Sequence, residues 1–144
     1  MHARMFLIAA TLSGIATAPC FAGQQTFPPD GNGLISFVTP SGNIGCAYAP
    51  AGGTKIYVPA DGGPELSCDR VDPSYLRFIL GKAGKAKRLS NVGDPSCCSA
   101  GPKLNYGNTW KKGKFTCVSE RTGLTCTRGD GHGFFISKAK TSAY

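Results

Sequence analysis

The sequence is poor in the residue types that build metal sites. It contains two histidines among 144 residues, and none of its seven cysteines forms a C-x-x-C pair. A cluster of histidine ligands and a paired-cysteine zinc site are therefore not expected, and no metal or cofactor is predicted. Walker, Rossmann and helix-turn-helix patterns are also missing, so neither a nucleotide nor a nucleic acid is an expected partner.

Acidic residues are scarce as well. Eight Asp and Glu stand against sixteen Lys and Arg. Four of these carboxylates fall in a stretch that resembles a loop, namely Asp61, Glu65, Asp69 and Asp72. Nothing in that stretch fixes two carboxylates at the separation that glycoside hydrolysis requires.

Long apolar runs are missing except near the N-terminus. Met5–Ala18 is uncharged and follows a basic residue, but it is too short to span a bilayer. This layout is typical of a secretory signal peptide, here residues 1–22, with cleavage after Ala22. A lipoprotein anchor on Cys20 is disfavoured because Pro19 occupies a position that requires a small residue. The sequence thus predicts an exported protein, periplasmic or secreted, with no transmembrane span.

Six cysteines remain after cleavage, and an even number in a short exported chain indicates three disulfides. These cysteines are Cys46, Cys68, Cys97, Cys98, Cys117 and Cys126. Fifteen basic side chains then stand against eight acidic ones, which gives the cleaved chain a net charge of +7. Each disulfide that closes a short loop is expected to stabilise the domain by about 3 kcal/mol.

Beyond the leader, the pattern predicts a single all-β domain that is mainly antiparallel. Residues 23–33 are polar and rich in Pro and Gly, and we expect a flexible arm there. Residues 34–144 consist of short apolar stretches separated by Gly, Pro, Asn and Asp, which is typical of strands joined by turns. The expected architecture is a small disulfide-stabilised β-sandwich or barrel-like domain built of hairpins, with at most one short helix.

Two segments resemble each other, and each predicts a hairpin. They are FVTPSGNIGC, which ends at Cys46, and CVSERTGLTC, which starts at Cys117. Each holds a cluster of turn-forming residues at its centre. If Glu120 pairs with Gly123, then Cys117 lies directly opposite Cys126, within the distance that a disulfide spans.

The partners of the other cysteines stay open. In the first hairpin Phe37 stands where the second hairpin has a cysteine, so Cys46 must pair elsewhere, and Cys68 is the nearest candidate. That pairing leaves Cys97 next to Cys98, and a bridge between adjacent cysteines is strained and rare. The alternative is a crossed arrangement in which Cys46 and Cys68 each bond to one member of the adjacent pair.

Residues 72–90 fit two structures. Asp72 and Pro73 resemble the N-cap and first position of a helix, and Gly81 resembles a helix stop. However, apolar residues alternate along the segment LRFIL, which favours a strand. We expect a hairpin here rather than a helix.

Four motifs in this order resemble one known family. They are FVTPSGNIGC, LNYG, CVSERTGLTC and GHGFFIS, within Phe37–Ser137. The family consists of small exported bacterial proteins known only as a domain of unknown function, with S-G-N-I-x-C and G-H-G-F motifs. The adjacent pair Cys97–Cys98 departs from the spacing of that family. The resemblance implies export and disulfides, and it implies no activity.

His132 is the histidine that remains after cleavage, and it lies between two glycines. One hypothesis is catalysis by His132 with a carboxylate such as Asp130. We favour a structural role, in which the glycines permit a tight turn and Phe134 or Phe135 enters the core.

Two basic clusters are the candidates for anion binding. Their members are Lys82, Lys85, Lys87, Arg88, Trp110, Lys111, Lys112 and Lys114. Cations beside an aromatic ring can hold anionic groups, although lysines at hairpin tips also serve solubility.

We therefore expect a non-enzymatic binding or envelope-associated module with a basic face. Its expected partner is an anionic envelope polymer, a lipid headgroup or another protein. The alternatives are a small hydrolase that uses His132 with a carboxylate, and an inhibitor of a hydrolase.

Overall fold

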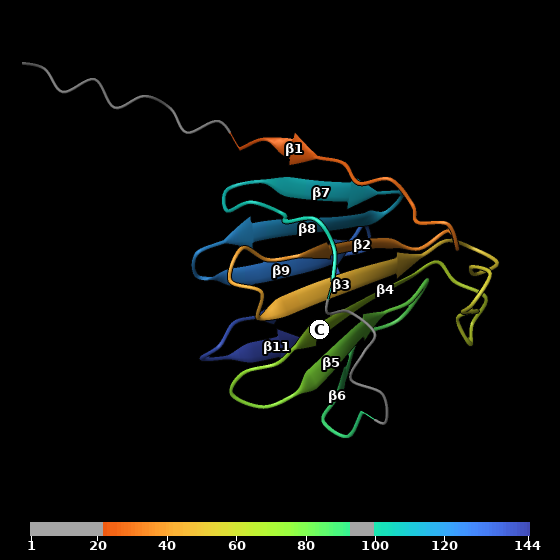
Figure 1. Ribbon diagram of the computed structural model, residues 1–144. Helices are drawn as coiled ribbons and strands as arrows, with labels where there is room; N and C mark the ends of the chain where they lie inside the picture. The colour runs from red at the N-terminus through yellow and green to blue at the C-terminus, as the bar shows by residue number, and fades with distance from the viewer. Residues whose placement is uncertain (1–21, 93–99) are drawn as a thin grey trace, which may run out of the picture.

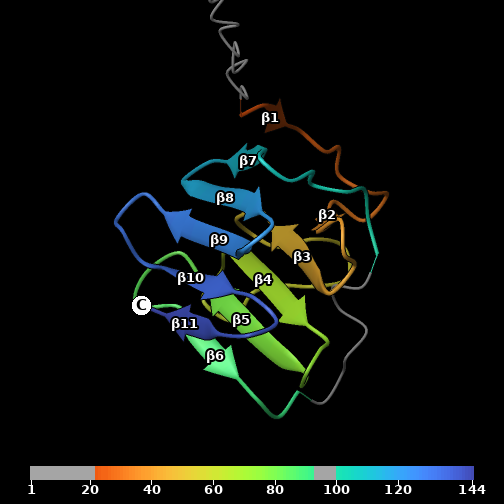
Figure 2. The ribbon, with the colours of Figure 1, turned by 90° about the vertical axis from the view of Figure 1, so that its left-hand side faces the viewer.

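The protein folds into two β-sheets that lie face to face (Figure 1 and Figure 2). The computed structural model describes residues 22–92 and 100–144. Within these ranges the chain forms eleven strands. In chain order they are β1 (Gln24–Gln25), β2 (Ile35–Val38), β3 (Ile44–Ala49), β4 (Glu65–Arg70), β5 (Leu76–Leu80), β6 (Lys87–Leu89), β7 (Thr109–Lys112), β8 (Phe115–Glu120), β9 (Gly123–Arg128), β10 (Gly133–Ile136) and β11 (Thr141–Ala143).

One sheet has five strands in the order β2-β3-β4-β5-β6, and the other has six in the order β1-β7-β8-β9-β10-β11. Neighbouring strands are antiparallel except for the parallel pair β1 and β7. The all-β, mainly antiparallel prediction is confirmed. Across the described residues there is no helix, so none there could cross a membrane. The helix considered for residues 72–90 is replaced by the hairpin β5–β6.

Buried residues alternate with more exposed ones along β5, β8 and β9, whereas β3 and β4 are buried at every position. In β5, Leu76, Phe78 and Leu80 are buried, whereas Arg77 and Ile79 between them are half-buried. β8 and β9 show the same alternation. This period of two sends one set of side chains between the sheets and the other set outwards.

Two cross-strand disulfides lie at the centre of the interior. Cys46 on β3 is bonded to Cys68, which lies opposite it on β4. Cys117 on β8 is bonded in the same way to Cys126 on β9. The sulfur atoms of Cys46, Cys68 and Cys126 lie within 4.8 Å of one another, so the two bridges face each other across the sandwich. The predicted pairing of Cys117 with Cys126 is confirmed, and Cys68 is the partner of Cys46.

Two of the sequence-based predictions, the signal peptide and the pairing of the adjacent cysteines, concern residues that the structure largely does not describe. The predicted leader, apart from its last residue, and the adjacent pair Cys97–Cys98 lie outside the described residues.

Residues 23–33 do not form the loose arm that we expected. They contain β1, which pairs with β7, and Phe27, which stacks on Phe37 with ring centroids 5.7 Å apart. Strand pairing and a packed ring thus outweigh the turn-forming composition of this segment.

The two sheets are related by an approximate internal two-fold repeat. In each sheet a row of four paired residues runs across four neighbouring strands. The rows are Phe37, Cys46, Cys68, Phe78 and Trp110, Cys117, Cys126, Phe134. The rings of Phe37 and Trp110 lie 5.1 Å apart between centroids. The rings of Phe78 and Phe134 lie 5.5 Å apart. Strands β2–β6 therefore correspond one by one to strands β7–β11.

Two buried arginines follow the same repeat. Arg70 at the end of β4 donates from Nη1 to the carbonyl oxygen of Ser137, 3.1 Å away and just past β10. Arg128 at the end of β9 donates from Nη1 to the carbonyl oxygen of Gly81, 2.5 Å away and just past β5. The repeat thus relates LSCDR to LTCTR. The likeness of FVTPSGNIGC to CVSERTGLTC instead compares β2–β3 with β8–β9, one strand out of phase.

Removal of either disulfide is expected to destabilise the protein in proportion to the loop that it closes. The bonded cysteines are 22 residues apart for Cys46–Cys68 and 9 residues apart for Cys117–Cys126. Loop-closure entropy then predicts losses of about 3.4 and about 2.6 kcal/mol for the Cys46→Ala/Cys68→Ala and Cys117→Ala/Cys126→Ala variants. Urea unfolding of both variants measures these losses. Unchanged unfolding free energies would contradict the role given to the bridges.

Candidate functional site

Among the connections between equivalent strands, the one from β3 to β4 differs most in length from its counterpart, and the candidate site lies there. β8 and β9 are joined by a tight turn, with Glu120 paired to Gly123. The equivalent strands β3 and β4 are joined by residues 50–64, which we call the 50–64 loop. In Figure 1 this loop projects from the ends of β3 and β4 at the right of the molecule. Since the equivalent strands need only a tight turn, the fold alone does not account for this long connection.

The outer face of the five-stranded sheet forms a trough beside the loop. The outward positions of β3 carry small residues, namely Gly45, Ala47 and Ala49. The outward positions of β4 carry polar residues, namely Glu65, Ser67 and Asp69. Ala47 and Ala49 of β3, with Glu65 and Ser67 of β4, line a cavity on this face.

The 50–64 loop is folded by its own hydrogen bonds. The backbone N–H and the Oγ1 hydroxyl of Thr54 donate to the carbonyl oxygen of Tyr57, at 2.7 and 3.1 Å. The N–H of Lys55 donates to the carbonyl oxygen of Asn32 at 3.0 Å, which ties the loop to the segment before β2. Gly53 has a φ of +84°, and a Cβ there would lie 2.6 Å from the Tyr57 carbonyl oxygen. This turn therefore requires glycine.

Tyr57 connects the loop to the sheet through Glu65. Its hydroxyl donates to Oε1 of Glu65 at 2.7 Å, and the Ser67 hydroxyl donates to the same oxygen at 3.1 Å. Burial and then the hydrogen bond to Glu65 raise the pKa of Tyr57 to about 12. The phenol therefore stays protonated and remains a donor near neutral pH.

A second polar group lies farther along the same face. Arg77 binds Asp69 through two hydrogen bonds of 2.8 Å, from Nε to Oδ1 and from Nη2 to Oδ2. The Tyr75 hydroxyl donates to Oδ2 of Asp69. The hydrogen bond to Asp69 is the largest cause that raises the pKa of Arg77. Glu65 and Asp69 thus lie on β4, which corrects the sequence-based expectation that they belong to a loop.

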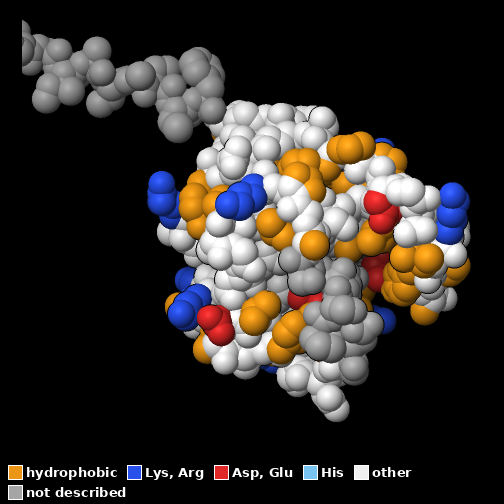
Figure 3. Space-filling model, in the orientation of Figure 1, with side chains coloured by type: hydrophobic (Ala, Val, Ile, Leu, Met, Phe, Trp, Pro, Cys, Tyr) orange, Lys and Arg blue, Asp and Glu red, His pale blue; other side chains and the backbone are white. Residues whose placement is uncertain are grey.

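A cavity of about 380 Å³ lies between the loop and this face. Its apolar walls are Leu34, Ala47, Ala49, Ile56 and Ile79. Its polar groups are Tyr57, Glu65, Ser67 and Arg77. Two of these lining residues are open to solvent, since Ile56 and Tyr57 are 69% and 44% exposed. Figure 3 shows apolar side chains gathered on the side of the molecule where this loop lies, at the right of the view.

His132 lies in the turn between β9 and β10. Its carbonyl oxygen accepts a hydrogen bond of 2.8 Å from the N–H of Arg128, and its N–H donates to Oδ1 of Asp130 at 3.3 Å. The neighbouring Gly133 passes so close to β9 that a Cβ would lie 2.2 Å from the Cys126 carbonyl oxygen. The Asp130 carboxylate forms an ion pair with Arg128, at 2.6 Å between Nη2 and Oδ2. These contacts support the turn role of the histidine.

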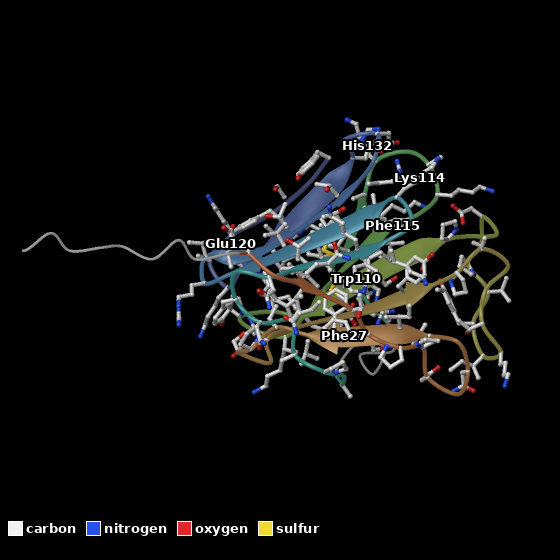
Figure 4. All side chains as sticks on the ribbon, turned by 90° about the horizontal axis from the view of Figure 1, so that it is seen from above. Phe27, Trp110, Lys114, Phe115, Glu120 and His132 are labelled. Atoms are coloured by element: carbon white, nitrogen blue, oxygen red, sulfur yellow. A yellow bond between two sulfur atoms is a disulfide. The ribbon has the colours of Figure 1, made fainter. Side chains whose placement is uncertain are left out.

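Trp110 cannot serve as the aromatic partner of a bound anion. It is 1% exposed and lies between the two sheets (Figure 4). Its ring packs against Phe37 and Tyr48 with centroid distances of 5.1 and 5.7 Å. The sequence pattern suggested an exposed ring beside lysines, but the inward positions of β7 belong to the core.

The cations of the two basic clusters are divided between different parts of the molecule. Lys87–Arg88 lies on β6 at the edge of the five-stranded sheet, and Lys111–Lys112 lies on β7 of the other sheet. Lys85 lies in the β5–β6 turn. In the described part of the chain, Lys82 and Lys114, one from each cluster, line a common hollow of about 330 Å³ together with Arg128 and Asp130. In Figure 4 Lys114 lies at the same end of the sandwich as His132.

Comparison with known proteins does not assign the chain to a group. No protein-family model, no curated protein and no solved structure matches it. The resemblance to a family of exported bacterial proteins stays a prediction. We therefore infer the function of the site from its geometry.

Sequence reasoning missed Tyr57, Glu65 and Ser67 as members of one site. The alternation of polar and buried residues in ELSCDR was a signal for a strand with a polar outer face. No signal in the sequence indicated that Tyr57, from a connection rich in Gly and Pro, would fold back onto that face.

Asp130 is expected to contribute to stability in a pH-dependent way. The hydrogen bond from Arg128 lowers its pKa below the ordinary value. A lowered folded-state pKa stabilises the protein above the unfolded-state pKa, and this contribution is lost as the pH falls through the folded-state value. The Asp130→Asn variant lacks this contribution. Its urea midpoint should therefore fall less than that of the unmodified protein between about pH 5 and pH 2.

His132→Asn separates the two side chains that act on Asp130 in that experiment. It leaves the carboxylate and Arg128 in place and removes the charge of His132, which is a smaller cause of the lowered pKa of Asp130 than the hydrogen bond from Arg128. Its acid-induced fall should therefore lie between that of the unmodified protein and that of Asp130→Asn. Equal falls in the unmodified protein and in Asp130→Asn would rule out a stabilising Arg128–Asp130 pair.

Proposed function

We propose that the protein is a non-enzymatic binding module whose ligand site is the cavity between the 50–64 loop and the outer face of the five-stranded sheet. The observation that carries this proposal is a cavity of about 380 Å³ with apolar walls and a few convergent polar groups. Ligand sites in proteins typically have volumes of roughly 300–1,000 Å³ and this same mixture of walls. A small organic molecule fits this description.

The way in which the loop is held supports binding. Its turn is closed by backbone and Thr54 hydrogen bonds, and Tyr57 is anchored on Glu65. A site that is formed before the ligand arrives loses less conformational entropy on binding. The internal repeat also supports a binding role for the loop. Both halves share the same arrangement of strands, whereas the 50–64 loop occurs in one half.

The geometry at His132 gives less support to the hydrolase alternative. A general base needs a third group that orients it. The nearby Asp130 carboxylate is engaged by Arg128 and by the N–H of His132 instead. Export of the protein remains part of the proposal. The disulfides are compatible with an oxidising compartment.

Filling the cavity is expected to abolish ligand binding. Ala47 lies on the outer face of β3 and lines the cavity, and Ala47→Phe places a ring in it. We expect members of a small-molecule fragment library to shift the amide NMR signals of Ala47, Tyr57 and Ser67 in the unmodified protein. The same fragments should have no effect on the Ala47→Phe variant.

The internal repeat provides a matched control for this substitution. Val118 follows Cys117 as Ala47 follows Cys46, so it takes the equivalent position on the other sheet. Val118→Phe adds a ring there and should leave fragment binding unchanged. Fragments that bind the Ala47→Phe variant as well as the unmodified protein would refute the proposed site.

A second candidate function is binding of an anionic group in the hollow between Lys82 and Lys114. It is favoured by the convergence of these two lysines from separate clusters. The partner would be an anionic envelope polymer or a lipid headgroup. Exposed charges interact over roughly 8–10 Å at physiological salt, so two cations that share a hollow can act together on one phosphate.

Two variants with the same net charge separate this site from general basicity. Lys82→Glu/Lys114→Glu reverses the converging pair, and Lys85→Glu/Lys112→Glu reverses two lysines that do not line the hollow. We expect the first variant to sediment at least fivefold less with vesicles that contain anionic lipid, while the second loses less than half of its binding. Equal losses would show that only the net charge matters.

A further inference from the structure

The cavity under the 50–64 loop contains a buried carboxylate whose charge is not balanced by the described part of the protein. Glu65 is 8% exposed and lines the cavity. No Lys, Arg or His among residues 22–92 and 100–144 forms an ion pair with it. Burying a carboxylate without a cation is unfavourable, and proteins usually compensate such a group.

The hydrogen bonds of Glu65 leave one of its oxygens open. Tyr57 and Ser67 both donate to Oε1. Neither of these hydrogen bonds ends on Oε2. The two hydroxyls therefore fix the orientation of the carboxylate, and Oε2 is the oxygen that a ligand can reach.

The neighbouring cations are engaged by other groups. The guanidinium of Arg77 is bound to both oxygens of Asp69. The ammonium group of Lys55 donates to the Gly31 carbonyl oxygen at 3.0 Å, and that of Lys82 donates to the Asp61 carbonyl oxygen. Lys87 adjoins Ile79 in the strand register but is exposed and forms no ion pair with Glu65. Glu65 is thus the carboxylate that lines the cavity, and Arg77, the cation that also lines it, is already paired with Asp69.

We infer that the ligand carries a primary ammonium or a guanidinium group on a short aliphatic stem, with Glu65 as its counter-ion. This inference rests on the proposed binding function of the cavity. The cationic head would donate to Oε2, where a charged hydrogen bond is stronger than in water because Glu65 is 8% exposed. The stem would lie against Ala47, Ile56 and Ile79, which form apolar walls. An anionic ligand would instead meet Glu65 at close range.

The test uses three probes that share a five-carbon chain and differ in the head group: pentylammonium, 1-pentanol and pentanoate. Each is titrated into the unmodified, 15N-labelled protein, and the shifts of the Ala47, Ser67 and Ile79 amides are followed. We expect pentylammonium to bind at least tenfold more tightly than either of the other two. Comparable binding of 1-pentanol would overturn the inference about charge, while shifts at these amides would leave the proposed cavity site standing.

Absence of shifts with all three probes would count against the proposed function as well as against the inference. Comparable binding of 1-pentanol, in contrast, would refute only the inference about charge. The failure of the inference and the failure of the proposed function therefore give different results. The comparison of head groups needs no variant, and it stays decisive if a substitution in the cavity prevents folding.

Glu65→Gln is the variant that tests the counter-ion directly. Glutamine keeps the volume and an acceptor for Tyr57 and Ser67, and it removes the charge. We expect this variant to bind pentylammonium at least tenfold more weakly and 1-pentanol without change. Glu120→Gln is the control, because Glu120 lies at the other end of the sandwich (Figure 4). Unchanged pentylammonium binding by a folded Glu65→Gln variant would refute the inference.

Discussion

The two disulfides that face each other between the sheets are the constraint on which the structure depends. Each joins residues that are directly opposite on neighbouring strands, so each fixes the register of its own sheet. Because sulfurs of both bridges lie within 4.8 Å of one another, they also form a central contact between the sheets. A chain of this size has a modest apolar core. Cross-links at its centre allow the outer faces to carry residues that do not serve packing.

Features that occur in both halves of the internal repeat are those that stabilise the fold, and features that occur in one half are not required by it. The rows through the disulfides, and the arginines that reach across at Arg70 and Arg128, occur in both halves. These features stabilise two equivalent sheets. The 50–64 loop has no counterpart in the other half, and its Tyr57 forms a polar group with Glu65 and Ser67 of β4. The 50–64 loop is absent from the other half and encloses a cavity, and for these two reasons we assign the ligand site to it.

The sequence predicted the features that depend on local chemistry and missed those that depend on long-range packing. The hairpin that pairs Glu120 with Gly123 followed from turn residues and strand geometry, and it fixed the bridge between Cys117 and Cys126. Trp110 was misjudged because its lysine neighbours suggested exposure, whereas strand alternation buries it opposite Cys117. The contact of Tyr57 with Glu65 could not be predicted, since the loop conformation depends on Gly53 and on a distant carbonyl at Asn32.

Net charge and local charge lead to different expectations for the ligand, and burial decides which applies. The excess of Lys and Arg made an anionic partner the natural expectation from composition. Exposed lysines are screened by salt within about 8–10 Å, whereas a carboxylate removed from water keeps a stronger local field. A basic surface can therefore govern which molecules approach the protein, while Glu65 governs which head group is held in the cavity. The positive charge of the chain as a whole is no argument against a cationic ligand there.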